Sequence, residues 1–301
     1  MKIVEKKAGH DEKLAKLKVH LSNPLSLCWQ VSKKCNYHCP FCLSGEQSNV
    51  ELPLEKMKEI VDILVESNLV RIDFTGGEPF LRPDFLDILT YAADRGIETL
   101  VTSNGSIWSE EIAKTLLATN TLLLISLDGN AKTHNKSRGP GAYARAVTNI
   151  KRYRDAGVPI RVNFLVRRDN LDQINYIYDL VKSLGVERLF YILIAPQGKA
   201  YQNDELLLTE EERQYYLELL RKKKAASGDE PFITIQDYAT NLHSCFLIDS
   251  RGDIISQGYS EDDCIRVGNI LVEGLDKCWN NPVFNHRGHF LQYAYMFDYY
   301  M

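Results

Sequence analysis

The segment Cys35-Asn36-Tyr37-His38-Cys39-Pro40-Phe41-Cys42 places three cysteines within eight residues. It follows directly on a β-rich run at residues 25–32, Leu-Ser-Leu-Cys-Trp-Gln-Val-Ser. In sheets of parallel strands, binding and catalytic groups gather just beyond the carboxyl ends of the strands. We therefore expect this cysteine loop to lie at the functional edge of the first strand.

Outward from that loop, short β-rich runs alternate with longer helical runs as far as residue 194. We expect strands at Leu25–Ser32, Val70–Phe74, Thr99–Thr102, Leu122–Ser126, Ile160–Leu165 and Arg188–Ile194. We expect helices at Leu54–Ser67, Pro83–Arg95, Glu110–Ala118, Ala142–Ala156 and Leu171–Leu184. Such alternation is typical of a parallel sheet covered by helices, which right-handed crossovers curl into a barrel. The predicted fold class is α/β, a partial (β/α)6 TIM-like barrel.

The alternation breaks after residue 194. Thr209 and Glu212 form a capping-box pattern that predicts a helix running to about residue 224. Residues 245–256 indicate a β-hairpin with Ser250-Arg251-Gly252 at its turn. We therefore divide the chain into a lead-in at 1–24, a barrel at 25–194 and a small α+β extension at 195–301.

Composition and charge exclude several classes of protein. The 301 residues are 45% hydrophobic and 25% charged, as in soluble globular proteins, and the net charge of −4 gives no basic surface for nucleic acid. No apolar run is long enough to span a membrane, and the first residues lack the apolar stretch of a signal peptide. We expect a cytoplasmic protein. An odd count of seven cysteines disfavours a disulfide framework, so the crowded thiols indicate metal or redox chemistry.

Three thiolates at this spacing can bind three irons of a [4Fe–4S] cluster and leave the fourth iron open. A zinc knuckle that borrows His38 is the alternative. With Phe41 just before the last cysteine, residues 25–194 resemble the radical S-adenosylmethionine (SAM) superfamily. The resemblance implies one cluster held by Cys35, Cys39 and Cys42, with SAM on the open iron.

Further segments resemble the SAM-binding motifs of that superfamily. Residues 75–79, Thr-Gly-Gly-Glu-Pro, are similar to its GGEP motif, whose glycines leave room for the methionine end of SAM while Glu78 accepts from the ammonium. By the same resemblance Ser126 lies near the ribose and Arg138 reaches the carboxylate. Phe41 could equally be core, and Asn163 could equally be a buried amide. The implied cofactor-binding residues are Tyr37, Phe41, Gly76, Gly77, Glu78, Pro79, Ser103, Asn104, Ser126, Asp128, Arg138 and Asn163.

Residues 244–284 resemble the SPASM/twitch extensions of some radical SAM enzymes, with two departures that matter. Gln257 stands where the pattern has a cluster cysteine, and no closing Cys-x2-Cys pair follows. We therefore expect no auxiliary cluster. If one forms, its sulfur ligands are Cys245, Cys264 and Cys278, completed by His286, His289, Asp298 or a substrate atom.

The resemblance implies that an external reductant of the flavodoxin or ferredoxin type drives cleavage of SAM to a 5′-deoxyadenosyl radical, which takes a hydrogen atom from the substrate. Without an auxiliary cluster, redox-neutral outcomes are favoured: epimerisation, rearrangement or decarboxylation. Our first hypothesis for the substrate is a small polar metabolite (a sugar, nucleoside, aminocyclitol or amino acid). The reason is that residues 1–24 leave no room for a peptide-recognition domain.

The alternatives are a peptide maturase that epimerises or crosslinks, a dehydrogenase using an auxiliary cluster, and a non-catalytic iron–sulfur scaffold. An epimerase needs a hydrogen donor, often a thiol. Cys28 shares strand parity with Gln30 and Ser32, so it could point into the barrel and serve as that donor. It could equally be a small buried hydrophobic residue.

Overall fold

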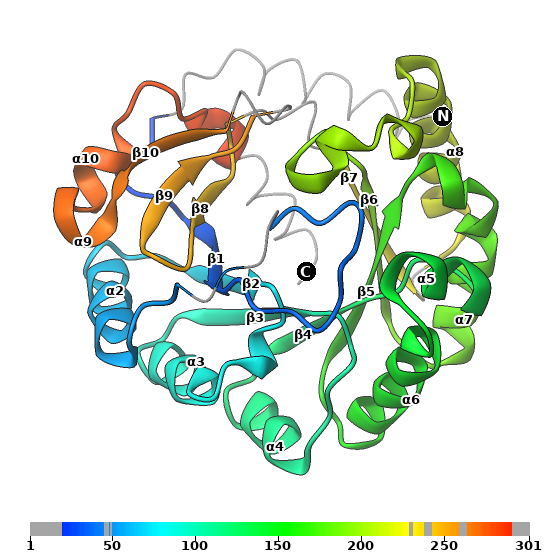
Figure 1. The fold of residues 1–301 in the computed structure, drawn as a ribbon, viewed down its shortest axis with the longest axis horizontal. Helices are drawn as coiled ribbons and strands as arrows, with labels where there is room; N and C mark the ends of the chain where they lie inside the picture. The colour runs from blue at the N-terminus through cyan, green and yellow to red at the C-terminus, as the bar shows by residue number, and fades with distance from the viewer. Residues whose placement is uncertain are drawn as a thin grey trace.

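The computed structural model describes residues 20–44, 48, 50–228, 231–237, 243–258 and 264–290. Most of the expected lead-in at 1–24 lies outside these described residues, as does Asp298. Figure 1 looks into a curved sheet whose strands surround a central opening and whose helices form the outer ring.

Ten strands of the described chain form one sheet in the order β10-β9-β8-β1-β2-β3-β4-β5-β6-β7. The bounds of the strands are β1 Ser26–Ser32, β2 Arg71–Gly76, β3 Glu98–Ser103, β4 Leu122–Ser126, β5 Ile160–Val166, β6 Arg188–Leu193, β7 Phe232–Asp237, β8 Phe246–Ile248, β9 Asp253–Ser256 and β10 Ile265–Asn269. The α-helices are α2 Leu54–Glu66, α3 Phe85–Asp94, α4 Glu110–Ala118, α5 Ala131–Arg138, α6 Ala142–Asp155, α7 Ile174–Ser183, α8 Glu210–Ala226, α9 Ile270–Glu273 and α10 Leu275–Trp279. In these residues no helix combines the length and the apolar character that crossing a bilayer requires.

The predicted α/β barrel is confirmed. All six expected strands and all five expected helices are present, with ends that differ by at most a few residues. One helix within the barrel, α5, was not predicted. Its sequence, Ala-Lys-Thr-His-Asn-Lys-Ser-Arg, has no apolar stripe, and only His134 and Ser137 are buried. The helix starts because the Asn130 side chain accepts from the Thr133 amide, a contact that periodicity cannot reveal.

The parallel sheet continues beyond the six strands expected. After α8, whose predicted capping box between Thr209 and Glu212 is present, β7 pairs in parallel with β6. The sequence pattern missed β7 because only Ile233 of its residues is fully buried, so its hydrophobic pattern is weak. The division of the chain into domains remains a prediction, but the (β/α) repeat extends past residue 194.

The predicted hairpin at residues 245–256 is present and extends the barrel on its other side. Strands β8 and β9 pair antiparallel around the turn, and β8 pairs in parallel with β1, which places Leu247 opposite Cys28. Figure 1 shows β8, β9 and β10 continuing the sheet from β1. The C-terminal extension therefore forms part of the wall around the central opening.

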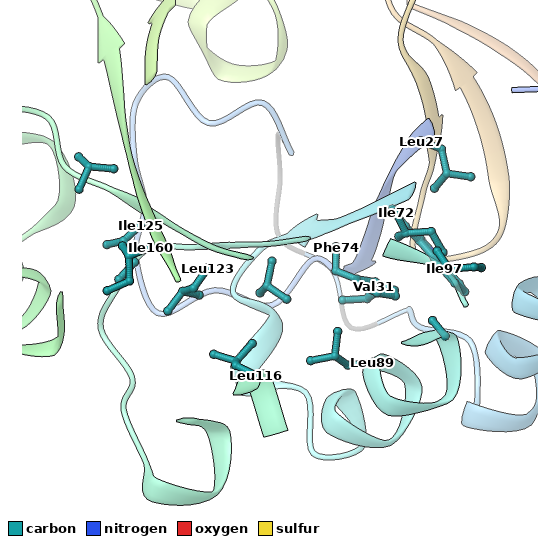
Figure 2. Packing of buried hydrophobic residues seen from close by; sticks show 14 of the residues in the cluster. Leu27, Val31, Ile72, Phe74, Leu89, Ile97, Leu116, Leu123, Ile125 and Ile160 are labelled. Atoms are coloured by element: carbon teal, nitrogen blue, oxygen red, sulfur yellow. The ribbon is translucent and has the colours of Figure 1, made fainter. Parts of the chain in front are cut away.

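Alternation along the strands separates the hydrophobic core from the central cavity. Leu27, Val31, Ile72 and Phe74 belong to the core cluster that packs between the sheet and its helices, and Figure 2 shows them with Leu89 of α3. The residues between them on the strands have the opposite orientation and face the barrel interior. Side chains on the outer face of the sheet therefore pack in the hydrophobic core. Side chains on the inner face are available to line a functional site.

His289 ties β1 to the chain just before β8. Its Nε2 accepts from the Leu25 amide at 3.0 Å, while Nδ1 lies 2.8 Å from the Ser244 carbonyl oxygen. These partners require a neutral ring with the proton on Nδ1. Burial lowers the pKa of His289 from its ordinary value of 6.5 to about 4. The neutral ring is thus part of the folded structure.

Replacing this histidine should reduce the acid sensitivity of the fold. Between pH 6.5 and about 4 the unfolded chain binds a proton at His289 that the folded chain does not. The free energy of unfolding therefore falls as the pH falls, by up to about 1.4 kcal/mol per pH unit. In His289→Gln, denaturant unfolding measured across this range should show a shallower decline. Identical slopes in the two proteins would contradict this role.

Candidate active site

The cysteine loop follows β1 and reaches across the barrel opening toward the segments after β6 (Figure 1). The Cys42 carbonyl accepts from the Lys199 amide at 3.0 Å, and the Pro40 carbonyl accepts from Asn203 Nδ2 at 2.9 Å. All three cysteines line a cavity of about 300 Å³ that opens into the barrel. The loop therefore forms one wall of that cavity.

The three thiols of the loop are the expected iron ligands. They are only partly buried, and Cys35 Sγ accepts from the Tyr37 amide at 3.4 Å and from Asn104 Nδ2 at 3.7 Å. In the described residues, no three side chains of His, Cys, Asp or Glu stand close enough together to hold one metal ion. Three separate thiolates bound to different irons match the chemistry of a [4Fe–4S] cluster.

Gly76 and Gly77 lie directly against the backbone of the cysteine loop. The Gly77 amide donates to the Ser32 carbonyl at 2.7 Å, and the Glu78 amide donates to the Lys34 carbonyl at 2.8 Å. A Cβ on Gly77 would lie 1.9 Å from the Lys34 carbonyl oxygen, and one on Gly76 would lie 2.1 Å from that of Ser32. Only glycine permits this approach. Both glycines line the cavity.

Protein donors surround the carboxylate of Glu78. Its carboxylate is fully buried and accepts from the Ser103 hydroxyl and, at 2.7 Å, from the Asn104 amide. Burial raises the pKa of Glu78 to about 7. Neither Glu78 nor the buried Pro79 is among the residues that line the cavity, whereas Ser103 and Asn104 are. Glu78 thus holds the loop whose Asn104 contacts Cys35.

A buried ionic group closes the cavity near Phe41. Asp128 is fully buried and pairs with Arg138 Nε, and its other oxygen lies 3.6 Å from Arg167 Nη1. Although burial raises the pKa of Asp128, the two guanidinium groups hold it lower, at about 2. The guanidinium carbons of Arg138 and Arg167 lie 5.6 and 4.1 Å from the centre of the Phe41 ring. Phe41 is therefore both a buried residue and part of the cavity wall.

Ser126 and Asn163 stand side by side on β4 and β5 and both line the cavity. Asn163 Oδ1 accepts from Arg161 Nε at 3.0 Å, and both residues are buried. Tyr37 also lines the cavity, and its hydroxyl accepts from Arg145 Nε. The structure therefore gathers the residues expected around SAM, apart from Glu78 and Pro79.

Sequence reasoning missed the charged inner layer of the barrel. Asp73 of β2 and Arg161 of β5 line the cavity, and the Arg161 guanidinium lies 4.4 Å from the centre of the Phe190 ring. Asp73 accepts from the Thr102 hydroxyl at 3.0 Å, and burial raises its pKa. The available signal was a charged residue inside an otherwise apolar strand, at the parity that faces the barrel interior.

The cysteines outside the loop do not gather at one place. Cys28 and Cys245 line the cavity with their sulfur atoms 3.9 Å apart, whereas Cys264 and Cys278 do not line it. Cys278 is buried, and its sulfur would lie 2.9 Å from a Cβ placed on Gly268.

The two histidines considered as further ligands have other partners. His289 is engaged with the backbone at both ring nitrogens. His286 stacks on Trp279, with ring centres 4.4 Å apart, and its Nδ1 accepts from the Leu21 amide at 3.4 Å.

Comparison with known proteins agrees with this site. The family model of the radical SAM superfamily matches residues 29–181. The chain belongs to the radical SAM superfamily. The [4Fe–4S] cluster and SAM expected from the sequence are thereby supported as its cofactors.

Among curated relatives, the AdoMet-dependent heme synthase of Methanosarcina barkeri is 32% identical over 189 residues, which cover 61% of this chain and 54% of that protein. The chain thus spans about half the length of this relative. The mycofactocin maturase MftC of Mycobacterium ulcerans is 28% identical over 284 residues, covering 88% of this chain and 77% of that protein.

Solved structures of radical SAM enzymes share the fold. SuiB of Streptococcus suis bound to S-adenosylmethionine aligns with a TM-score of 0.73 at 17% identity, covering 93% of this chain and 71% of that one. Native anSMEcpe with bound AdoMet and the Kp18Cys peptide aligns with a TM-score of 0.71 at 20% identity, covering 86% and 81%. At these identities the likeness concerns the fold alone.

The glycine contact predicts a steric defect specific to the cluster loop. In Gly77→Ala the new methyl group must displace the Lys34 backbone just before Cys35, so iron bound after anaerobic reconstitution should fall several-fold. Gly96→Ala is the control, because its Cβ meets no atom within 4 Å and only its positive φ costs stability. Iron content and thermal midpoint are measured for both. A normal iron content in Gly77→Ala would show that the loop tolerates the displacement.

Proposed function

We propose that this chain generates an organic radical from SAM and directs it at a carbon atom of a small polar metabolite. One observation carries this proposal: a single cavity joins the three cysteines to a layer of buried polar side chains. When bound, the cluster supplies the electron that splits SAM into methionine and the 5′-deoxyadenosyl radical. The electron comes from an external one-electron carrier of the flavodoxin or ferredoxin type.

The protein's own residues bind and orient the reactants. Cys35, Cys39 and Cys42 hold the irons, and Asn104 orients the Cys35 sulfur by donating to it. Arg138 lines the cavity while Asp128 fixes its guanidinium, so it can receive the carboxylate of SAM in a bidentate contact. The apolar residues of the lining, such as Leu165 and Ile192, keep water away from a reactive radical.

The inner layer of the barrel supports a small polar substrate. Asp73, Arg161 and Asn163 present a carboxylate, a guanidinium and an amide to the same cavity. Such polar groups on a cavity wall can fix the orientation of a substrate that carries hydroxyl, amino or carboxylate groups. Sugars, nucleosides, aminocyclitols and amino acids carry such groups.

We propose a redox-neutral outcome: epimerisation, rearrangement or decarboxylation. The positions of the remaining cysteines support it, since Cys245 lies beside Cys28 on the cavity wall while Cys278 packs against Gly268. We therefore propose that Cys245 and Cys278 do not serve together as ligands of an auxiliary cluster. Substrate oxidation would need such a set, or another acceptor for the second electron.

The second candidate is modification of a peptide, which the comparisons favour. MftC is named a maturase and is similar over 88% of this chain, and SuiB, whose fold is shared, has been solved bound to its precursor peptide. In this alternative one side chain of a peptide would enter the cavity.

Anaerobic reconstitution tests the reaction class. The wild-type chain should bind about four irons and should release 5′-deoxyadenosine when SAM and dithionite are added. Cys39→Ala should lose this product to the background level, because one iron ligand is missing. Cys264→Ala, which changes a cysteine outside the cavity, should retain it. Formation of 5′-deoxyadenosine at the wild-type rate by Cys39→Ala would overturn the ligand assignment.

Deuterium transfer distinguishes the two substrate classes. The loaded protein is incubated with SAM, dithionite and deuterated amino acids, sugars, aminocyclitols or nucleosides, and the mass of 5′-deoxyadenosine is measured. Deuterium acquired from one of these sets supports the metabolite. Deuterium acquired only from a fully deuterated peptide digest would overturn it in favour of a peptide.

A further inference from the structure

Two thiols from distant parts of the chain meet on the wall of the substrate cavity. Cys28 comes from the middle of β1, and Cys245 immediately precedes β8. Their sulfur atoms are 3.9 Å apart, and both residues line the same cavity as the cysteine loop.

Strand pairing and a buried histidine hold Cys28 and Cys245 next to each other. Strands β1 and β8 pair in parallel, with Leu247 opposite Cys28. The buried His289 bonds both to Leu25, at the start of β1, and to Ser244, the residue before Cys245. Both backbones are therefore held in place beside the sulfur atoms.

The environment keeps Cys28 protonated. The contact with Cys245, together with burial, raises the pKa of the Cys28 thiol well above its ordinary value. A protonated thiol retains a hydrogen atom that can be transferred. An S–H bond is weaker than most C–H bonds, so a carbon radical in this cavity can take that hydrogen.

We propose that Cys28 and Cys245 form a redox-active thiol pair that gives a hydrogen atom to a carbon radical in the cavity and then closes to a disulfide. The inference rests on the proposed function. An S–S bond is about 2.0 Å long, so side-chain rotations must bring the two sulfur atoms together from 3.9 Å.

The steps balance as follows. The S–H bond of Cys28 breaks homolytically while a C–H bond forms on the substrate, which leaves a thiyl radical. This sulfur bonds to that of Cys245, which loses its proton to solvent. The remaining electron passes to a one-electron acceptor of the iron–sulfur or flavin protein class. A dithiol reductant then restores both thiols by thiol–disulfide exchange.

The disulfide is tested directly on the cluster-loaded protein. Diamide, which oxidises two thiols to a disulfide, is added anaerobically, free thiols are alkylated, and peptides are analysed by mass spectrometry. We expect a peptide that links Cys28 to Cys245, absent from Cys28→Ser and Cys245→Ser but retained in Cys278→Ala. Alkylation of both Cys28 and Cys245 after diamide treatment would overturn the pair.

Hydrogen donation is tested in D2O, where thiol hydrogens exchange for deuterium. With SAM and dithionite but no added substrate, the 5′-deoxyadenosyl radical is the carbon radical in the cavity. Wild type and Cys278→Ala should give monodeuterated 5′-deoxyadenosine, and Cys28→Ser should give several-fold less deuterated product. Equal deuterium content in Cys28→Ser and wild type would overturn the donor role and leave the proposed function standing. No 5′-deoxyadenosine from the wild type would overturn the proposed function itself, whatever the diamide result.

Discussion

The contact on which the site depends is the backbone packing of Gly76 and Gly77 against the start of the cysteine loop. Each glycine has a carbonyl oxygen where any other residue would carry its Cβ. The Gly77 amide donates to Ser32 at the end of β1, and the Glu78 amide donates to Lys34, so the start of the loop is joined to the segment after β2 as well as to β1. The loop that carries the iron ligands is thereby positioned by two adjacent strands, although it has no regular secondary structure itself.

From this contact a chain of hydrogen bonds leads back to the cluster ligands. Glu78 is fully buried, and its carboxylate holds the Asn104 loop, whose side chain donates to Cys35. On the opposite side Asp128 fixes Arg138 beside Phe41. The Glu78 carboxylate acts as a structural anchor, because its oxygens accept from protein donors. Asp128 holds Arg138 through one oxygen and lines the cavity itself.

Local patterns predicted most of the barrel because each amphipathic helix and each buried strand carries its own periodicity. They failed at α5, which is almost wholly polar, and at β7, where one residue is fully buried. Most of the residues that the family motifs imply as SAM-binding line the cavity. Asp73 and Arg161 were missed. Their strand parity indicates that each side chain faces the barrel interior, but only the folded sheet shows that both line the same cavity.

The sequence by itself determined the ligand spacing of the cysteine loop and the glycines beside it, since both are features of short covalent segments. It also determined the alternation of strands and helices that makes a barrel. Only the tertiary structure decided that Cys28 meets Cys245, 217 residues away, and that the Glu78 carboxylate accepts from the Asn104 amide. These two contacts arise from strand pairing and side-chain burial. Both depend on the whole sheet, so a local sequence pattern cannot predict them.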